Sequence, residues 1–169
     1  DVLVVDMGAQ TVLLNGASRA NVVNQPPSVF FALDPDPTVA ENLVLARADV
    51  PRVVPWKDEL RAIEAFMEGM PFQVPPRKLV RQLAAGEKQK LEILKQLYLG
   101  TRIMILDEPT SVLTPDEADE VLGMVKAMTR EGKLSVIIIT HKFREVLAFA
   151  DDVSILRRGK LVASQAVSE

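Results

Sequence analysis

Two short apolar runs in the second half of the chain predict strands. Ile103 to Leu106 runs directly into Asp107 and Glu108, and a proline then breaks the chain. Leu134 to Thr140 forms a second run, and His141 follows it. Apolar runs of this length, bounded by turn signals, are typical of strands buried on both faces of a parallel sheet. Since the ligands of open α/β sheets bind at the carboxyl ends of the strands, we expect the polar residues after both runs to lie at such an edge.

Apolar residues at helical spacing fill much of the remaining sequence. Trp56 to Met70 is the clearest helix, and its apolar stripe is expected to form the core of a small helical subdomain. The tetrad Thr114 to Glu117 has the residues of a capping box with proline at the first helical position, so a helix should begin there and end at Gly132. A helix between two neighbouring strands implies a parallel βαβ unit. Val153 to Arg157 and Leu161 to Ala163 are expected to pair as a hairpin.

The pattern divides the chain into an α/β part and a helical part. Val2 to Val5 and Thr11 to Leu14 resemble two strands around a turn, and Gln25 to Pro37 contains four prolines and reads as a loop. We therefore expect residues 1–38 and 100–169 to form an α/β core. Residues 39–99 are expected to form an inserted helical subdomain.

Composition limits the classes of function. The net charge is −3 and the pI is near 5.3, which offers no positively charged footprint for nucleic acid. The chain has no cysteine, which fits a cytoplasmic protein and leaves no thiolate for a metal. No apolar stretch approaches the roughly 20 residues that span a bilayer. Any membrane association is therefore expected to come through a partner.

The acidic pair after the first strand is the strongest chemical signal. Burying one carboxylate is costly and burying two neighbours is more so, unless a cation or a reaction uses them. Asp107 and Glu108 therefore indicate a metal or catalytic site, with a plain acidic turn as the alternative. His141 is the one histidine in the chain, and its place after the neighbouring strand favours a functional role. Its alternative role is that of a polar residue that caps the strand.

A second candidate site lies just upstream of the acidic strand. Ala84, Ala85, Gly86 and Glu87 open a helix whose apolar residues recur at helical spacing. Small residues at a helix start leave backbone N–H groups free to approach an anion, and the helix dipole favours negative charge there. Alone, this segment could equally be an ordinary helix start. Its position one helix before Asp107 favours the functional interpretation.

These segments together resemble the ATP-binding subunit of ABC transporters, over nearly the whole chain. Leu83 to Glu87 is similar to the family signature Leu-Ser-Gly-Gly-Gln, and Ile103 to Thr110 resembles its Walker B strand with the catalytic glutamate. Ser111 to Thr114 stands where the family has its D-loop, and His141 matches the switch histidine. Val22 to Gln25 resembles the Q-loop.

The details resemble one branch of this family. Gly86 to Gln89 and Val112 to Pro115 are similar to the first ATPase half of simple-sugar and nucleoside importers. The resemblance implies a P-loop NTPase (RecA-like) ABC ATPase core with an inserted helical subdomain. It also implies that ATP hydrolysis is coupled to transport of a small solute. The implied location is cytoplasmic, peripheral on the inner face of the cell membrane.

The resemblance also implies roles for single residues, with ATP and Mg²⁺ as the cofactors. Asp107 would hold the magnesium through its water shell, and Glu108 would polarise the attacking water. His141 would hydrogen-bond the γ-phosphate, and Gln25 would touch the metal or the water. Ala84 to Glu87 would act in trans, on nucleotide held by a second ATPase domain in a head-to-tail dimer. The implied membrane partners are transmembrane permease subunits.

The chain departs from the family pattern at two places. No Gly-x-x-x-x-Gly-Lys-Ser/Thr occurs in the 169 residues, so the Walker A loop that cradles phosphates is missing. In the family that loop precedes the strand resembled by Val2 to Asp6, and the chain is therefore expected to begin after it and to be inactive alone. Ala84 stands where the signature has its serine, whose hydroxyl faces the γ-phosphate.

Three interpretations follow from these matches and departures. The first is the ATPase subunit of an importer. The second is a degenerate or truncated, non-hydrolysing ABC partner that acts through protein contacts and its signature in trans. The third is an ABC-type ATPase outside transport, in DNA repair or translation, which the acidic pI disfavours.

Overall fold

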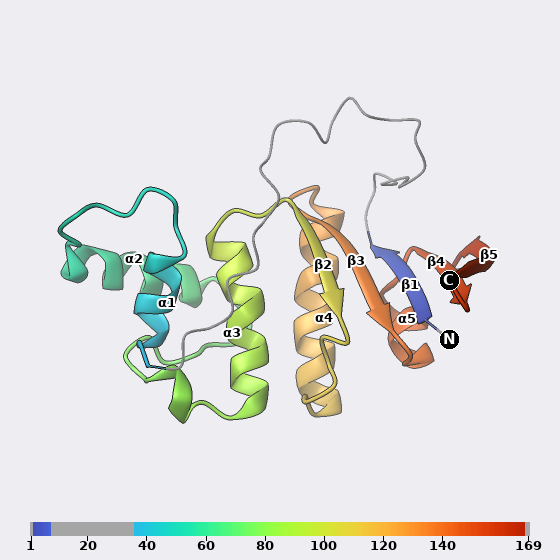
Figure 1. Cartoon of the computed structure of the whole chain (residues 1–169), viewed down its shortest axis with the longest axis horizontal. Helices are drawn as coiled ribbons and strands as arrows, with labels where there is room; N and C mark the ends of the chain where they lie inside the picture. The colour runs from blue at the N-terminus through green and yellow to red at the C-terminus, as the bar shows by residue number, and fades with distance from the viewer. Residues whose placement is uncertain (1, 8–35, 168–169) are drawn as a thin grey trace.

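A mixed sheet and a group of helices form the part of the chain that the computed structural model describes, residues 2–7 and 36–167 (Figure 1). The elements in chain order are β1 (Val2–Met7), α1 (Val39–Leu45), α2 (Trp56–Glu68), a 3₁₀ turn (Val80–Gln82), α3 (Ala85–Tyr98), β2 (Ile103–Asp107), α4 (Pro115–Arg130), β3 (Ser135–Thr140), α5 (Phe143–Phe149), β4 (Asp152–Arg157) and β5 (Lys160–Ala166). The strand predicted at Thr11 to Leu14 lies outside the described residues, as does Gln25.

The sheet has the strand order β2-β3-β1-β4-β5. β2 and β3 are parallel, with Leu106 opposite Ile138 and Asp107 opposite Ile139. This confirms the predicted parallel unit β2-α4-β3. β1 pairs antiparallel with both β3 and β4, and β5 pairs antiparallel with β4 as the predicted hairpin.

The prediction that the acidic strand is buried on both faces was wrong. Met104 and Leu106 are buried, but Ile103 and Ile105 on the opposite face are 38% and 49% exposed. β3 alternates in the same way. Val136 and Ile138 are buried, whereas Ile137 and Ile139 are half-buried. Side chains alternate between the faces of a strand, and only one face of this pair is covered in the described part of the chain.

Local sequence fixes where α4 begins. The Thr114 side chain accepts a hydrogen bond from the Glu117 backbone, and the Glu117 carboxylate accepts from the Thr114 N–H at 3.0 Å. Pro115 occupies the first turn, where its missing N–H costs nothing. The predicted capping box is therefore present. α4 then places Val121, Leu122 and other apolar residues against the sheet.

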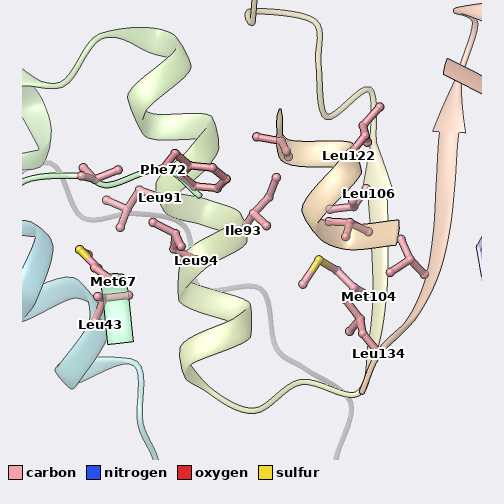
Figure 2. Packing of buried hydrophobic residues seen from close by; sticks show 14 of the residues in the cluster. Leu43, Met67, Phe72, Leu91, Ile93, Leu94, Met104, Leu106, Leu122 and Leu134 are labelled. Carbon is pink, nitrogen blue, oxygen red and sulfur yellow. The ribbon is translucent and has the colours of Figure 1, made fainter. Parts of the chain in front are cut away.

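The core continues from the sheet into the helices (Figure 2). On one side of α3, Leu91 and Leu94 face the α1 and α2 residues Leu43 and Met67 (Figure 2). Beyond α3, a second set of apolar residues lies between α4 and the strands, and the labelled members are Met104, Leu106, Leu122 and Leu134. α1, α2 and α3 all fall within residues 39–99, but the boundaries of the helical subdomain remain a prediction. In the part of the chain described here, no helix combines the length and apolar character needed to cross a bilayer.

Candidate functional site

The candidate residues Glu108 and His141 are brought together by the parallel pairing of β2 and β3. Each follows the carboxyl end of its strand, and the strands lie side by side in register. The Glu108 N–H donates to the Ile139 carbonyl at 2.8 Å, which extends the ladder one residue beyond β2. The two loops that follow the strands therefore start from one rigid edge.

Glu108 and His141 touch through their side chains. Nδ1 of His141 lies 2.6 Å from Oε1 of Glu108. A carboxylate can only accept, so Nδ1 donates in this contact when Glu108 is ionised. The His141 side chain is 71% exposed, whereas that of Glu108 is 34% exposed. The opposite ring nitrogen, Nε2, therefore remains available for a ligand, and the partner of Nδ1 is a side-chain carboxylate.

Glu108 has a strained backbone. Its φ is +47°, in the left-handed region that a non-glycine residue adopts at a cost on the order of 1–3 kcal/mol. Its carbonyl accepts from the Ser111 N–H at 3.1 Å, so Glu108 opens a tight turn away from β2. Such strain persists where surrounding contacts fix the chain, and it clusters at functional sites.

One oxygen of Glu108 is left for a polar ligand. Oε2 is buried and has no hydrogen-bond partner among the described residues. A buried polar atom of this kind is ordinarily satisfied by water, an ion or a ligand. A carboxylate with one oxygen on a histidine and the other unpaired can accept a proton from a bound water.

Asp107 is suited to hold a hydrated cation. Its side chain is exposed at the end of β2 and makes no hydrogen bond or ion pair with another described residue. Within residues 2–7 and 36–167, no group of three or more His, Cys, Asp or Glu residues is placed to hold a metal. A Mg²⁺ ion at Asp107 would therefore take most of its ligands from water and phosphate, which is its usual preference.

The signature segment lies at the start of α3. Ala84 is the N-cap residue, and its N–H donates to Oε2 of Glu87 at 2.8 Å. Lys78 Nζ lies 3.0 Å from the same carboxylate. The Ala84 hydrogen bond, followed by Lys78, lowers the pKa of Glu87. Because alanine has no hydroxyl, only half of a capping box is formed.

Gly86 lies close to the segment that follows the acidic pair. A Cβ built on Gly86 would lie 3.2 Å from Leu113 Cδ2 and 3.5 Å from the Val112 carbonyl oxygen. Figure 1 shows the start of α3 and the carboxyl ends of β2 and β3 at the same end of the molecule. The polar contacts of Ala84 and Glu87 nevertheless involve Lys78, not the Glu108–His141 pair.

Four residues that the sequence did not single out form a bonded network next to the Glu108 and His141 segments. They are Thr110, Thr140, Lys142 and Glu145, which bond to one another. Glu145 stands in the first turn of α5, which closely follows β3, and this position is a weak signal that it lies near the same strand ends.

The missing cap hydroxyl leads to a stability prediction. Ala84→Ser is expected to raise the free energy of unfolding by about 1 kcal/mol, because serine at the N-cap accepts from a free backbone N–H. Urea denaturation measures the change. Ala85→Ser, one position inside the helix, is the matched control and should give no gain. Equal or smaller stability for Ala84→Ser than for Ala85→Ser would contradict the assignment of the cap.

Comparison with known proteins gives three kinds of similarity. Residues 15–111, more than half of the chain, match the family described as ABC transporter. A nucleoside import ATP-binding protein, NupA of Lactococcus lactis subsp. cremoris, is 40% identical over 74% of this chain and 25% of its own length. A ribose import ATP-binding protein, RbsA of a Chelativorans species, is 34% identical over 82% of this chain and 27% of its own length. The chain therefore spans about a quarter of these relatives.

Solved structures resemble the described fold. The dimeric bacterial ABC transporter cassette MJ0796 aligns with a TM-score of 0.67 at 21% identity, covering 81% of this chain and 60% of that one. A post-hydrolysis state of the same cassette, bound to ADP and Pi, aligns with a TM-score of 0.66 at 22% identity over the same shares. At these sequence identities the likeness supports only the fold, which is the P-loop NTPase fold of ABC cassettes.

Proposed function

This chain belongs to the ABC transporter family, and from that premise we propose that it is part of the ATP-hydrolysing subunit of an importer. The observation that carries the proposal is the contact between Glu108 and His141 at the ends of two parallel strands. A carboxylate with one oxygen held by a histidine and the other unpaired suits a general base that activates water. The names of the relatives favour a nucleoside or a simple sugar such as ribose as the solute.

Three residues divide the chemistry between them. Asp107 would hold Mg²⁺ through its water shell, and the ion would neutralise charge on the phosphates. Glu108 accepts the proton of the attacking water on its carboxylate, and the side chain is 34% exposed. With a proton on both ring nitrogens, His141 donates from Nδ1 to Glu108 and from Nε2 to the γ-phosphate. Positioning and charge stabilisation supply most of the catalysis of phosphoryl transfer, so the rigid edge of β2 and β3 suits this reaction.

The remaining predicted site residues act around this centre. Ala85 and Gly86 present backbone N–H groups at the start of α3 to nucleotide held by a second ATPase domain, in a head-to-tail dimer, and Ala84 is the N-cap residue that precedes them. Glu87 fixes the first turn of that helix through its bond to the Ala84 N–H. Gln25, which lies outside the described residues, is proposed to touch the metal or the attacking water.

The partner at the membrane is a permease, and we place its contact on residues 39–99. Three large apolar side chains of this region are exposed, Leu45 at 57%, Val53 at 84% and Trp56 at 37%. Exposed large apolar side chains are candidates for contact with another protein. The proposed location is therefore cytoplasmic, peripheral on the inner face of the cell membrane.

The 169-residue chain by itself is expected to bind Mg-ATP weakly. The phosphate-cradling loop supplies most contacts to the β- and γ-phosphates, and no Gly-x-x-x-x-Gly-Lys-Ser/Thr occurs in the sequence. Isothermal titration calorimetry tests this, with a Kd well above the micromolar range as the expected result. Tight, micromolar binding would show that the nucleotide site is elsewhere. The same missing motif supports the second candidate, a non-hydrolysing partner that acts through its signature in trans.

A further inference from the structure

One buried carboxylate connects the two loops that carry Glu108 and His141. Glu145 on α5 is 5% exposed. Its Oε1 accepts from the Thr110 hydroxyl at 2.5 Å, and its Oε2 accepts from the Thr140 hydroxyl at 3.3 Å. Thr110 lies two residues after Glu108, and Thr140 directly precedes His141. Glu145 therefore bonds to both of the segments that carry Glu108 and His141.

Lys142 completes this network. Its Nζ donates to the Thr110 carbonyl at 2.8 Å and to the Thr110 hydroxyl at 2.9 Å, and lies 3.4 Å from Oε1 of Glu145. Its backbone N–H donates to the Thr140 hydroxyl at 3.1 Å. Each threonine hydroxyl thus accepts from Lys142 and donates to Glu145, so all the bonds agree in direction. A buried carboxylate is stable only when a cation pairs with it and hydrogen-bond donors satisfy its oxygens.

The network also accounts for the strained turn at Glu108. The left-handed backbone of Glu108 is fixed on its amino side by the N–H bond to Ile139. On its carboxyl side, the next anchor is Thr110, which is 1% exposed and held by both Lys142 and Glu145. A strained conformation persists only where the surrounding structure determines it from both sides.

We propose that Glu145, acting through Thr110 and Thr140, is a positioning residue that holds Glu108 in its left-handed turn and in contact with His141. Glu145 itself makes no hydrogen bond or ion pair with Glu108 or His141, and its effect passes through the two threonines. The catalytic meaning of this positioning rests on the proposed function, but the geometric effect does not. It can be measured without ATP.

The lone histidine provides the test. In the 169-residue chain, the imidazole of His141 gives a single Hε1 signal in a ¹H–¹³C NMR spectrum at one fixed pH. Glu108→Gln removes the charged acceptor 2.6 Å from Nδ1 and supplies the reference position of a histidine without its partner carboxylate. We expect two variants to move the signal toward that reference. One is Thr110→Val, which keeps the side-chain shape and removes the hydroxyl, and the other is Glu145→Gln.

Two controls isolate the hydroxyl network from general packing. Thr110→Ser retains the hydroxyl and should leave the His141 signal near its wild-type position. Thr129→Val removes another buried threonine hydroxyl, which bonds the Lys126 carbonyl within α4, and should also leave the signal unchanged. Should Thr110→Val fail to fold, Glu145→Gln tests the same anchor, because it keeps the side-chain shape and removes the charge that both threonine hydroxyls contact.

The outcomes separate this proposal from the proposed function. If Thr110→Val or Glu145→Gln folds and leaves the His141 signal at its wild-type position, while Glu108→Gln moves it, the positioning role of Glu145 is wrong. In a longer protein with a phosphate-binding loop, Thr110→Val should lower kcat by about 10–100-fold with little change in KM. Absence of ATPase activity in the unmutated longer protein would overturn the proposed function and leave the NMR result standing.

Discussion

Glu108→Gln is expected to lower ATP turnover by about 10²–10⁴-fold in a protein that joins these residues to a phosphate-binding loop. The substitution keeps the shape of the side chain, but it removes the carboxylate that takes the proton from water. ATP binding should survive, and the nucleotide-bound dimer should accumulate. Steady-state phosphate release gives the turnover, and gel filtration with Mg-ATP detects the dimer.

Asp107→Asn is the matched variant for this experiment, because it removes the neighbouring carboxylate. Asp107 is exposed and has no partner among the described residues, so its loss should not disturb the fold. It should weaken Mg²⁺-dependent binding of ATP, whereas Glu108→Gln should not. Turnover at the parental rate in Glu108→Gln would rule out the general-base role.

His141→Ala is expected to lower hydrolysis at least tenfold in the same protein. Loss of a hydrogen bond to a charged phosphate costs about 1.5–3 kcal/mol where that charge is stabilised. The variant also removes the donor that lies 2.6 Å from Glu108. Both effects act on the reaction, so kcat should fall more than the affinity for ATP.

Folding should be little affected by His141→Ala, since the side chain is 71% exposed. Thermal unfolding of the variant tests this directly. Lys133→Ala, an exposed substitution just before the opposite end of β3, is the control and should leave both turnover and unfolding unchanged. An unfolded His141→Ala protein, or one with an unchanged ATPase rate, would restore the interpretation of His141 as a strand cap.

Local patterns were sufficient to predict most of the described elements. The stripe from Trp56, the capping box at Thr114 and the apolar run before Asp107 each depend on neighbours in sequence, and α2, α4 and β2 formed there. The parallel pairing of β2 and β3 also followed, because a helix between two adjacent strands allows little else.

Features that depend on distant parts of the chain were not predictable in this way. The exposure of Ile105 depends on what covers the second face of the sheet, which an apolar run does not encode. The left-handed turn at Glu108 violates the usual preference of a non-glycine residue, so a local rule predicts against it. Glu145 reaches Thr110 across 35 positions of sequence, and no spacing rule connects them.

Phosphate release from Mg-ATP is the most direct test of the central claim, that these residues form the hydrolytic part of an ABC ATPase. The measurement compares the 169-residue chain with a longer protein in which a Gly-x-x-x-x-Gly-Lys-Ser/Thr loop precedes residue 1. The account predicts sustained release by the longer protein, abolished by Glu108→Gln, and background release by the short chain. A longer protein that folds and binds Mg-ATP but releases no phosphate would contradict the account and favour a non-hydrolysing partner.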